Sequence, residues 1–130
     1  MERSAKRRVL VIDDNPDVGN TIKWLLESEG FAVALAENGA QGLKAQRRQP
    51  ADIVVTDIFM PEQDGIETIW QLREEFPRVP IIVISGGSSL GRTDYSVVAR
   101  ELGAKKVLRK PFDPRELVEL VQQIARPPLS

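Results

Sequence analysis

The chain has 130 residues, of which 42% are hydrophobic and 28% charged, a balance typical of one folded soluble domain and not of a disordered chain. Its net charge of -1 provides no general attraction to nucleic acid or to an anionic membrane. Because the chain contains neither histidine nor cysteine, zinc sites, disulfides, haem ligation and Ser-His or Cys-His nucleophile pairs are excluded.

Five short apolar runs predict five β-strands, at residues 9–12, 31–36, 53–55, 81–84 and 106–108. The first, third and fourth runs do not alternate with polar residues, which is typical of strands covered on both faces of a parallel sheet. The second run carries large side chains only at Phe31, Val33 and Leu35, and this alternation favours a strand near an edge of the sheet. The fifth run is the weakest of the five.

Amphipathic stretches between these runs predict five helices. The first begins at Asn15, a good N-cap residue, and ends at Gly30. The second begins after Asn38, the third after Asp64, and the fourth spans residues 94–102.

Two of these helices carry further predictions. The third is expected to turn three apolar side chains inwards, those of Ile66, Ile69 and Trp70. The last has the clearest start. Asp113 is a good N-cap residue, Pro114 follows at the first helical position, and Glu116 at the third helical position would form a capping box with Asp113.

Five strand-helix units without repeats or linkers predict a doubly wound α/β domain with one core, spanning residues 1–130. No apolar run approaches the length of a membrane span, and the opening MERSAKRR lacks the apolar segment of a secretory signal. We therefore expect a cytoplasmic protein with no membrane association.

Polar residues gather where ligands of such sheets bind, at the carboxyl ends of the strands. They are Asp13 and Asp14 after the first strand, Asp57 and Ser85 at the ends of the third and fourth, and Lys110 after the fifth. Each alone has an ordinary structural explanation, since carboxylates cap helices and serines and lysines are common in loops. Their convergence at one edge indicates a site.

Three carboxylates at one edge indicate a cation site. Two carboxylates about 5 Å apart repel each other by roughly 3 kcal/mol even at an effective dielectric constant near 20. Without histidine and cysteine the ligands are oxygen atoms, which suit hard ions such as magnesium, manganese or calcium. We expect Asp13, Asp14 and Asp57 to hold such an ion.

Three further residues lie where a bound phosphate would need partners. Lys110 would either pair with Asp57 or hold a phosphate oxygen. Ser85 would donate its hydroxyl to the same phosphate, and Gly86 would allow close approach of the backbone and donate an amide.

Four segments together resemble the receiver domain of two-component response regulators: VLVIDDNPDV (9–18), VVTDIFMPEQDGIE (54–67), IIVISGG (81–87) and VLRKPFDPREL (107–117). The resemblance covers about residues 7 to 126 and agrees with that family in order, spacing and residue type. It implies a flavodoxin-like fold, with a five-stranded parallel sheet in the order 2-1-3-4-5 flanked by five helices.

The resemblance also implies a role for each site residue. Asp57 would be the phosphoacceptor, taking a phosphoryl group from a histidine kinase or phosphotransfer protein and later losing it to water. Magnesium or manganese would be bound directly by Asp14, Asp57 and the carbonyl of Phe59, and through water by Asp13. Lys110 and Ser85 would hold phosphoryl oxygens.

On this interpretation the chain is a switch and not a turnover enzyme, and it carries no output domain. It would regulate an unknown downstream protein or a fused output domain, without direct contact to nucleic acid. The face formed by the fourth helix, fifth strand and fifth helix, about residues 94–126, is where receivers often signal or form homodimers.

Three alternatives start from the same residues. The first is an interaction module of receiver fold that is never phosphorylated. The second is a haloacid-dehalogenase-like phosphatase, but that family has a second acid two residues after its nucleophile, where this chain has Phe59. The third is a nucleotide-binding domain, which the absence of a glycine-rich loop after the first strand argues against.

The chain departs from the receiver pattern at Val107, where the family usually carries an aromatic residue or histidine that moves on phosphorylation. Residues 86–96 form a longer Gly- and Ser-rich segment than usual, and we hypothesise that output works by ordering it. The family pattern also implies a cis peptide bond between Lys110 and Pro111.

Overall fold

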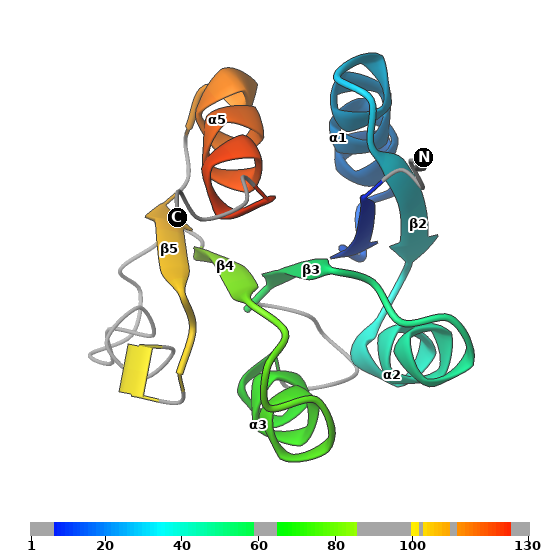
Figure 1. Ribbon diagram of the computed structural model, residues 1–130, viewed down its shortest axis with the longest axis vertical. Helices are drawn as coiled ribbons and strands as arrows, with labels where there is room; N and C mark the ends of the chain where they lie inside the picture. Colours follow the sequence, from blue (N-terminus) through cyan, green and yellow to red (C-terminus); the bar gives the residue numbers. More distant parts are fainter. Residues whose placement is uncertain (1–6, 59–64, 86–99, 102, 110–111, 126–130) are drawn as a thin grey trace, which may run out of the picture.

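The protein is an α/β sandwich in the computed structural model, which describes residues 7–58, 65–85, 100–101, 103–109 and 112–125. Five parallel strands form one sheet in the order β2-β1-β3-β4-β5 (Figure 1). The strands are β1 (Arg8–Ile12), β2 (Ala32–Ala36), β3 (Ile53–Asp57), β4 (Ile81–Ser85) and β5 (Lys106–Arg109). The predicted doubly wound sheet and its strand order are confirmed, and β2 lies at an edge.

Helices cover both faces of the sheet. Helices α1 (Pro16–Ser28) and α5 (Pro114–Ala125) pack on one face, and α2 (Gly39–Arg48) and α3 (Gly65–Glu75) pack on the other (Figure 1). Most of the predicted fourth helix, residues 94–102, lies outside the described residues, although Arg100 and Glu101 are helical. Within the described segments, no helix has the length and apolar character needed to cross a membrane.

The ends of the helices follow from their capping residues. The side chain of Asn15 accepts a hydrogen bond from the backbone N–H of Asp17 at 2.9 Å, and Gly30 after the helix has a φ of 97°. At the start of α5, the N–H of Arg115 donates to Asp113, and the N–H of Asp113 donates to the Glu116 carboxylate at 3.1 Å. The predicted capping box is therefore present.

Alternate residues of the inner strands feed two apolar clusters, one on each face of the sheet. The cluster under α2 and α3 includes Leu10, Val54 and Leu72, and the cluster under α1 and α5 includes Val11 and Leu117. Every residue of β3 and β4 is buried, as expected for strands without alternation. The two buried layers hold the central strands firmly and fix where their carboxyl ends lie.

The prediction that Trp70 faces inwards is wrong. Its side chain is 52% exposed, whereas Ile69 and Leu72 are 0% exposed. With a turn of about 100° per residue, Ile69 and Leu72 lie on one stripe of α3, while Trp70 is rotated away from it. Ile66 and Ile69 do pack toward the sheet as predicted.

Helix α2 lies unusually close to β1 at one point. The side chain of Asn38 caps its start by accepting a hydrogen bond from the N–H of Gln41 at 2.8 Å. A Cβ atom added to Gly42 would lie 2.4 Å from the Cδ1 atom of Ile12, so only glycine fits there. The helix backbone therefore rests directly on the Ile12 side chain.

A surface ion pair connects α2 with α3. The guanidinium of Arg47 donates to the Glu75 carboxylate, with an Nε–Oε1 distance of 2.7 Å. This hydrogen bond, with the positive charge of Arg47, lowers the pKa of the Glu75 carboxyl. The pair therefore favours the folded state above the unfolded pKa of Glu75, and its contribution is lost as the pH falls through the folded pKa.

Candidate functional site

The first two acids of the site follow β1 directly. The N–H of Asp13 donates to the carbonyl of Ala36 at 3.0 Å, which extends the pairing of β1 with β2 by one residue. The Asp13 side chain is only 4% exposed, and its Oδ1 atom accepts a hydrogen bond from the N–H of Asn15 at 2.8 Å. Asp13 therefore also organises the turn into α1, as its structural interpretation expects, while the Asp14 side chain is exposed.

The third acid, Asp57, is the last residue of β3 and is also only 4% exposed. It lies opposite Ile84 in the pairing of β3 with β4, and the next N–H, that of Ile58, donates to the Ile84 carbonyl at 2.9 Å. The backbone on both sides of Asp57 is thus held in the sheet. The Asp57 carboxylate therefore lies at the end of the central strand of the sheet.

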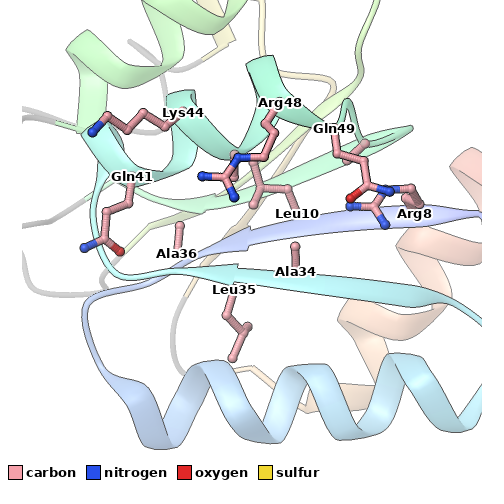
Figure 2. A pocket seen from close by; sticks show the side chains of 11 residues that line it. Arg8, Leu10, Ala34, Leu35, Ala36, Gln41, Lys44, Arg48 and Gln49 are labelled. Carbon is pink, nitrogen blue, oxygen red and sulfur yellow. The ribbon is translucent and has the colours of Figure 1, made fainter.

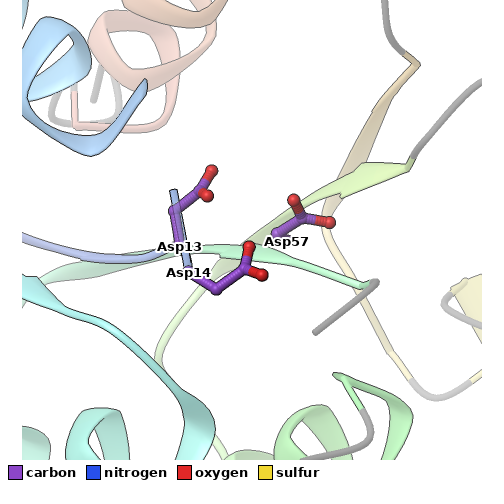
Figure 3. A group of neighbouring side chains, drawn as sticks. All are labelled: Asp13, Asp14 and Asp57. Carbon is purple, nitrogen blue, oxygen red and sulfur yellow. The ribbon is translucent and has the colours of Figure 1, made fainter. Parts of the chain in front are cut away.

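The three acids converge at the carboxyl edge of the sheet. One carboxylate oxygen from each of Asp13, Asp14 and Asp57 lies within 4.8 Å of the other two. Figure 3 shows the three side chains close together at the ends of β1 and β3. The predicted convergence of these residues is confirmed by this geometry.

This cluster is suited to a hard divalent cation. Two of its carboxylates are almost fully buried, and burying negative charges close together is costly unless a positive charge accompanies them. The donors are all oxygen atoms, which magnesium and manganese prefer. The residues present therefore fit the ion that the sequence predicts.

Ser85 is the last residue of β4, next to β3, and its side chain is 6% exposed. It ends its strand at the same edge of the sheet as Asp57 and lies opposite Arg109 of β5. The other predicted site residues, Phe59, Gly86 and Lys110, lie outside the described residues, as does the Lys110–Pro111 bond. Residues 86–96, the predicted output segment, also lie outside them.

One buried polar residue beside the site was not singled out from the sequence. The hydroxyl of Thr56 donates to the carbonyl of Asp57 at 3.2 Å, and its side chain is 0% exposed. The sequence feature that could have identified Thr56 is a polar residue inside an otherwise apolar run. This hydrogen bond helps to hold the backbone of Asp57 in place within β3.

Val107 lies in β5, opposite Val83 of β4. It is partly buried and packs against the apolar cluster under α2 and α3. An aliphatic side chain in this place fills space in the core and has no ring to reorient.

The model of the response regulator receiver domain family matches residues 9–122, and the chain belongs to this family. Over its full length the chain is 35% identical to an uncharacterized 14.6 kDa protein from the sodA1 3' region of Leptolyngbya boryana, covering 98% of both chains. It is 37% identical over 119 residues to the transcriptional regulatory protein CpxR of Escherichia coli, covering 92% of this chain and 49% of CpxR. The chain thus spans about half the length of CpxR.

Solved structures of receiver domains share this fold. A CheY-like receiver domain protein from Methanospirillum hungatei is 28% identical, with a TM-score of 0.84 over 92% of this chain and 93% of that one. A receiver domain protein from Clostridium thermocellum is 29% identical, with a TM-score of 0.82 over 91% and 93%. The fold and the family therefore agree.

Proposed function

We propose that this receiver domain is a phosphorylation-dependent switch in which Asp57 accepts a phosphoryl group in a magnesium-dependent reaction. The observation that carries the proposal is the meeting of three carboxylates within 4.8 Å at the carboxyl edge of the sheet. Family membership supports the proposal, because the acids after the first and third strands belong to the pattern by which the chain resembles receiver domains.

Transfer to Asp57 requires a fixed direction of attack and neutralised charge. An oxygen of the Asp57 carboxylate bonds to phosphorus while the N–P bond of a phosphohistidine breaks, and the imidazole nitrogen keeps that electron pair. Water later attacks phosphorus, which releases phosphate and restores the carboxylate. The sheet pairing on both sides of Asp57 supports this role, since it fixes the direction in which the carboxylate points.

All three acids would take part in holding the cation. Asp14 and Asp57 would bind magnesium or manganese directly, together with the carbonyl of Phe59, and Asp13 would bind it through water. When bound, the cation supplies positive charge that offsets the charge of the carboxylates and of the transferred group. Lys110 and Ser85 would hold phosphoryl oxygens, with an amide donated near Gly86.

A phosphohistidine donor would have to lie outside this sequence, because its 130 residues contain no histidine. We propose a sensor histidine kinase or a histidine phosphotransfer protein, meeting the receiver in the cytoplasm. The protein would assist its own phosphorylation and dephosphorylation without transforming an external substrate. Its output would be a changed contact with a downstream protein, a fused output domain or a second copy of the chain.

An interaction module that is never phosphorylated is the competing function, and Val107 favours it because the usual aromatic switch residue is missing. The two are separated by intact-mass measurement after incubation with acetyl phosphate and magnesium. We expect one added phosphoryl group, which is absent when a chelator replaces magnesium and absent in the Asp57→Asn variant. A chain that binds magnesium but never gains mass would contradict the switch and support the interaction module.

A further inference from the structure

A cavity of about 360 Å³ lies between α2 and the edge of the sheet formed by β1 and β2. Figure 2 shows Gln41 and Arg48 reaching from α2 toward β2, Lys44 extending outwards from the same helix, and Arg8 and Gln49 at one end. None of its lining residues belongs to the acid cluster of the candidate site. The cavity is therefore a separate feature of the fold.

The cavity exists because small side chains face α2. Along β2, Ala34 and Ala36 point toward α2, whereas Leu35 points to the other face, toward α1 (Figure 2). Helix α2 cannot move onto these alanines to fill the space, because its backbone already rests on Ile12 at Gly42. Ala34, which is only partly buried, is thus the accessible part of the apolar floor at the sheet edge, whereas Ala36 is buried.

The walls of the cavity are cationic. Arg8, Lys44 and Arg48 line it, and its lining contains no acidic residue. In the described part of the chain none of these three side chains is in an ion pair, in contrast to Arg47 on the same helix, which binds Glu75. Three positive charges therefore line a small space that has no carboxylate among its described lining residues.

One of these cations has a donor that lacks a partner. The Nε atom of Arg8 is buried and makes no hydrogen bond to any group in the described structure. The backbone N–H of Arg8, by contrast, donates to the Asp52 carboxylate at 2.8 Å. A buried donor without an acceptor is costly, which makes the position of the Arg8 side chain unusual.

The simpler explanation is that long basic side chains merely cover the alanines while their charges stay in water. It accounts for Lys44, whose side chain extends outwards from α2 in Figure 2. It does not account for Arg8, whose Nε atom is buried and not in water. Nor does it explain why the cavity stays open between the basic side chains and the floor.

We propose that this cavity binds a small organic phosphate, a phosphate monoester on a compact apolar body. A monoester carries a charge between about -1.5 and -2 at neutral pH, which suits three cations better than a single carboxylate would. Its oxygens match the guanidinium groups of Arg8 and Arg48, and its apolar body would lie on Ala34. The volume is at the lower end of ligand sites, so the ligand is small.

Phenyl phosphate is a suitable probe, titrated into isotope-labelled protein and followed by amide NMR shifts in buffer with a chelator and no magnesium. The chelator and the Asp57→Asn background keep the acid cluster out of the experiment, so the outcome does not depend on the proposed function. We expect saturable shifts confined to β2, the start of β1 and α2. Inorganic phosphate and benzyl alcohol, which each supply half of the probe, should bind more weakly than phenyl phosphate.

Variants connect the binding to the named residues. Arg48→Gln should weaken phenyl phosphate binding by about tenfold, because it removes a charge-assisted contact. Lys44→Gln should weaken it by a smaller factor, because the Lys44 side chain extends outwards from α2. Arg47→Gln is the matched control, since it removes the neighbouring charge outside the cavity and should change the affinity by less than about twofold. Ala45→Leu should block binding by filling the space. Equal affinity in all four variants, or shifts elsewhere in the protein, would overturn the proposal.

Discussion

Asp14→Asn is expected to unfold at a higher temperature than the unsubstituted chain when magnesium is absent. The substitution removes one of three carboxylates whose oxygens lie within 4.8 Å of one another. At an effective dielectric constant near 20 the repulsion of one such pair is about 3 kcal/mol, and the exposure of Asp14 reduces this to about 1 kcal/mol. That corresponds to a rise of a few degrees in the unfolding midpoint.

Magnesium should reverse the order of the two proteins. A ligand that binds only the folded state stabilises it in proportion to its occupancy, so the unsubstituted chain should gain stability as magnesium is added. Asp14→Asn should gain much less, because it lacks one of the proposed ligands. The measurement is thermal unfolding across a magnesium titration, with Glu27→Gln on the exposed surface of α1 as the control for loss of one negative charge. A midpoint of Asp14→Asn at or below that of the control without magnesium would argue against a crowded anionic site.

Leu72→Ala should lower the free energy of unfolding by about 2–5 kcal/mol, the usual cost of emptying a fully buried leucine site. Leu72 is 0% exposed and joins α3 to the apolar cluster on that face of the sheet. Trp70→Ala, two residues earlier on the same helix, should change the stability by less than about 1 kcal/mol because its side chain is largely in solvent.

Chemical denaturation of both variants at neutral pH tests this contrast. The midpoint should fall strongly for Leu72→Ala and little for Trp70→Ala, with similar denaturant slopes. A larger loss of stability for Trp70→Ala than for Leu72→Ala would indicate that the Trp70 side chain faces inwards, as the sequence suggested. The test therefore examines the packing of α3 directly.

The sequence predicted the sheet well because each inner strand is a short, unbroken apolar run. The runs at 9–12 and 81–84 became fully buried stretches of β1 and β4, and the alternation at 31–36 placed β2 at an edge. The convergence of Asp13 and Asp57 was predictable for a topological reason, since carboxyl ends of parallel strands meet at one edge.

Other features depend on packing that no local pattern reveals. Trp70 is apolar and close in sequence to Ile69, but the rotation of α3 on the sheet is set by Leu72 and Phe76 as well. The cavity beside β2 requires both the alanines of that strand and the close approach of α2 at Gly42. The cavity would not be apparent without the position of α2 over β1.

The central claim is that Asp57, among three neighbouring carboxylates, carries the phosphoryl group. It is tested most directly by treating the phosphorylated protein with borohydride, which reduces an acyl phosphate of aspartate to homoserine, and by sequencing the peptides with mass spectrometry. We predict homoserine at position 57 alone. Homoserine at position 13 or 14, or at no position of a protein that has gained a phosphoryl group, would contradict the account.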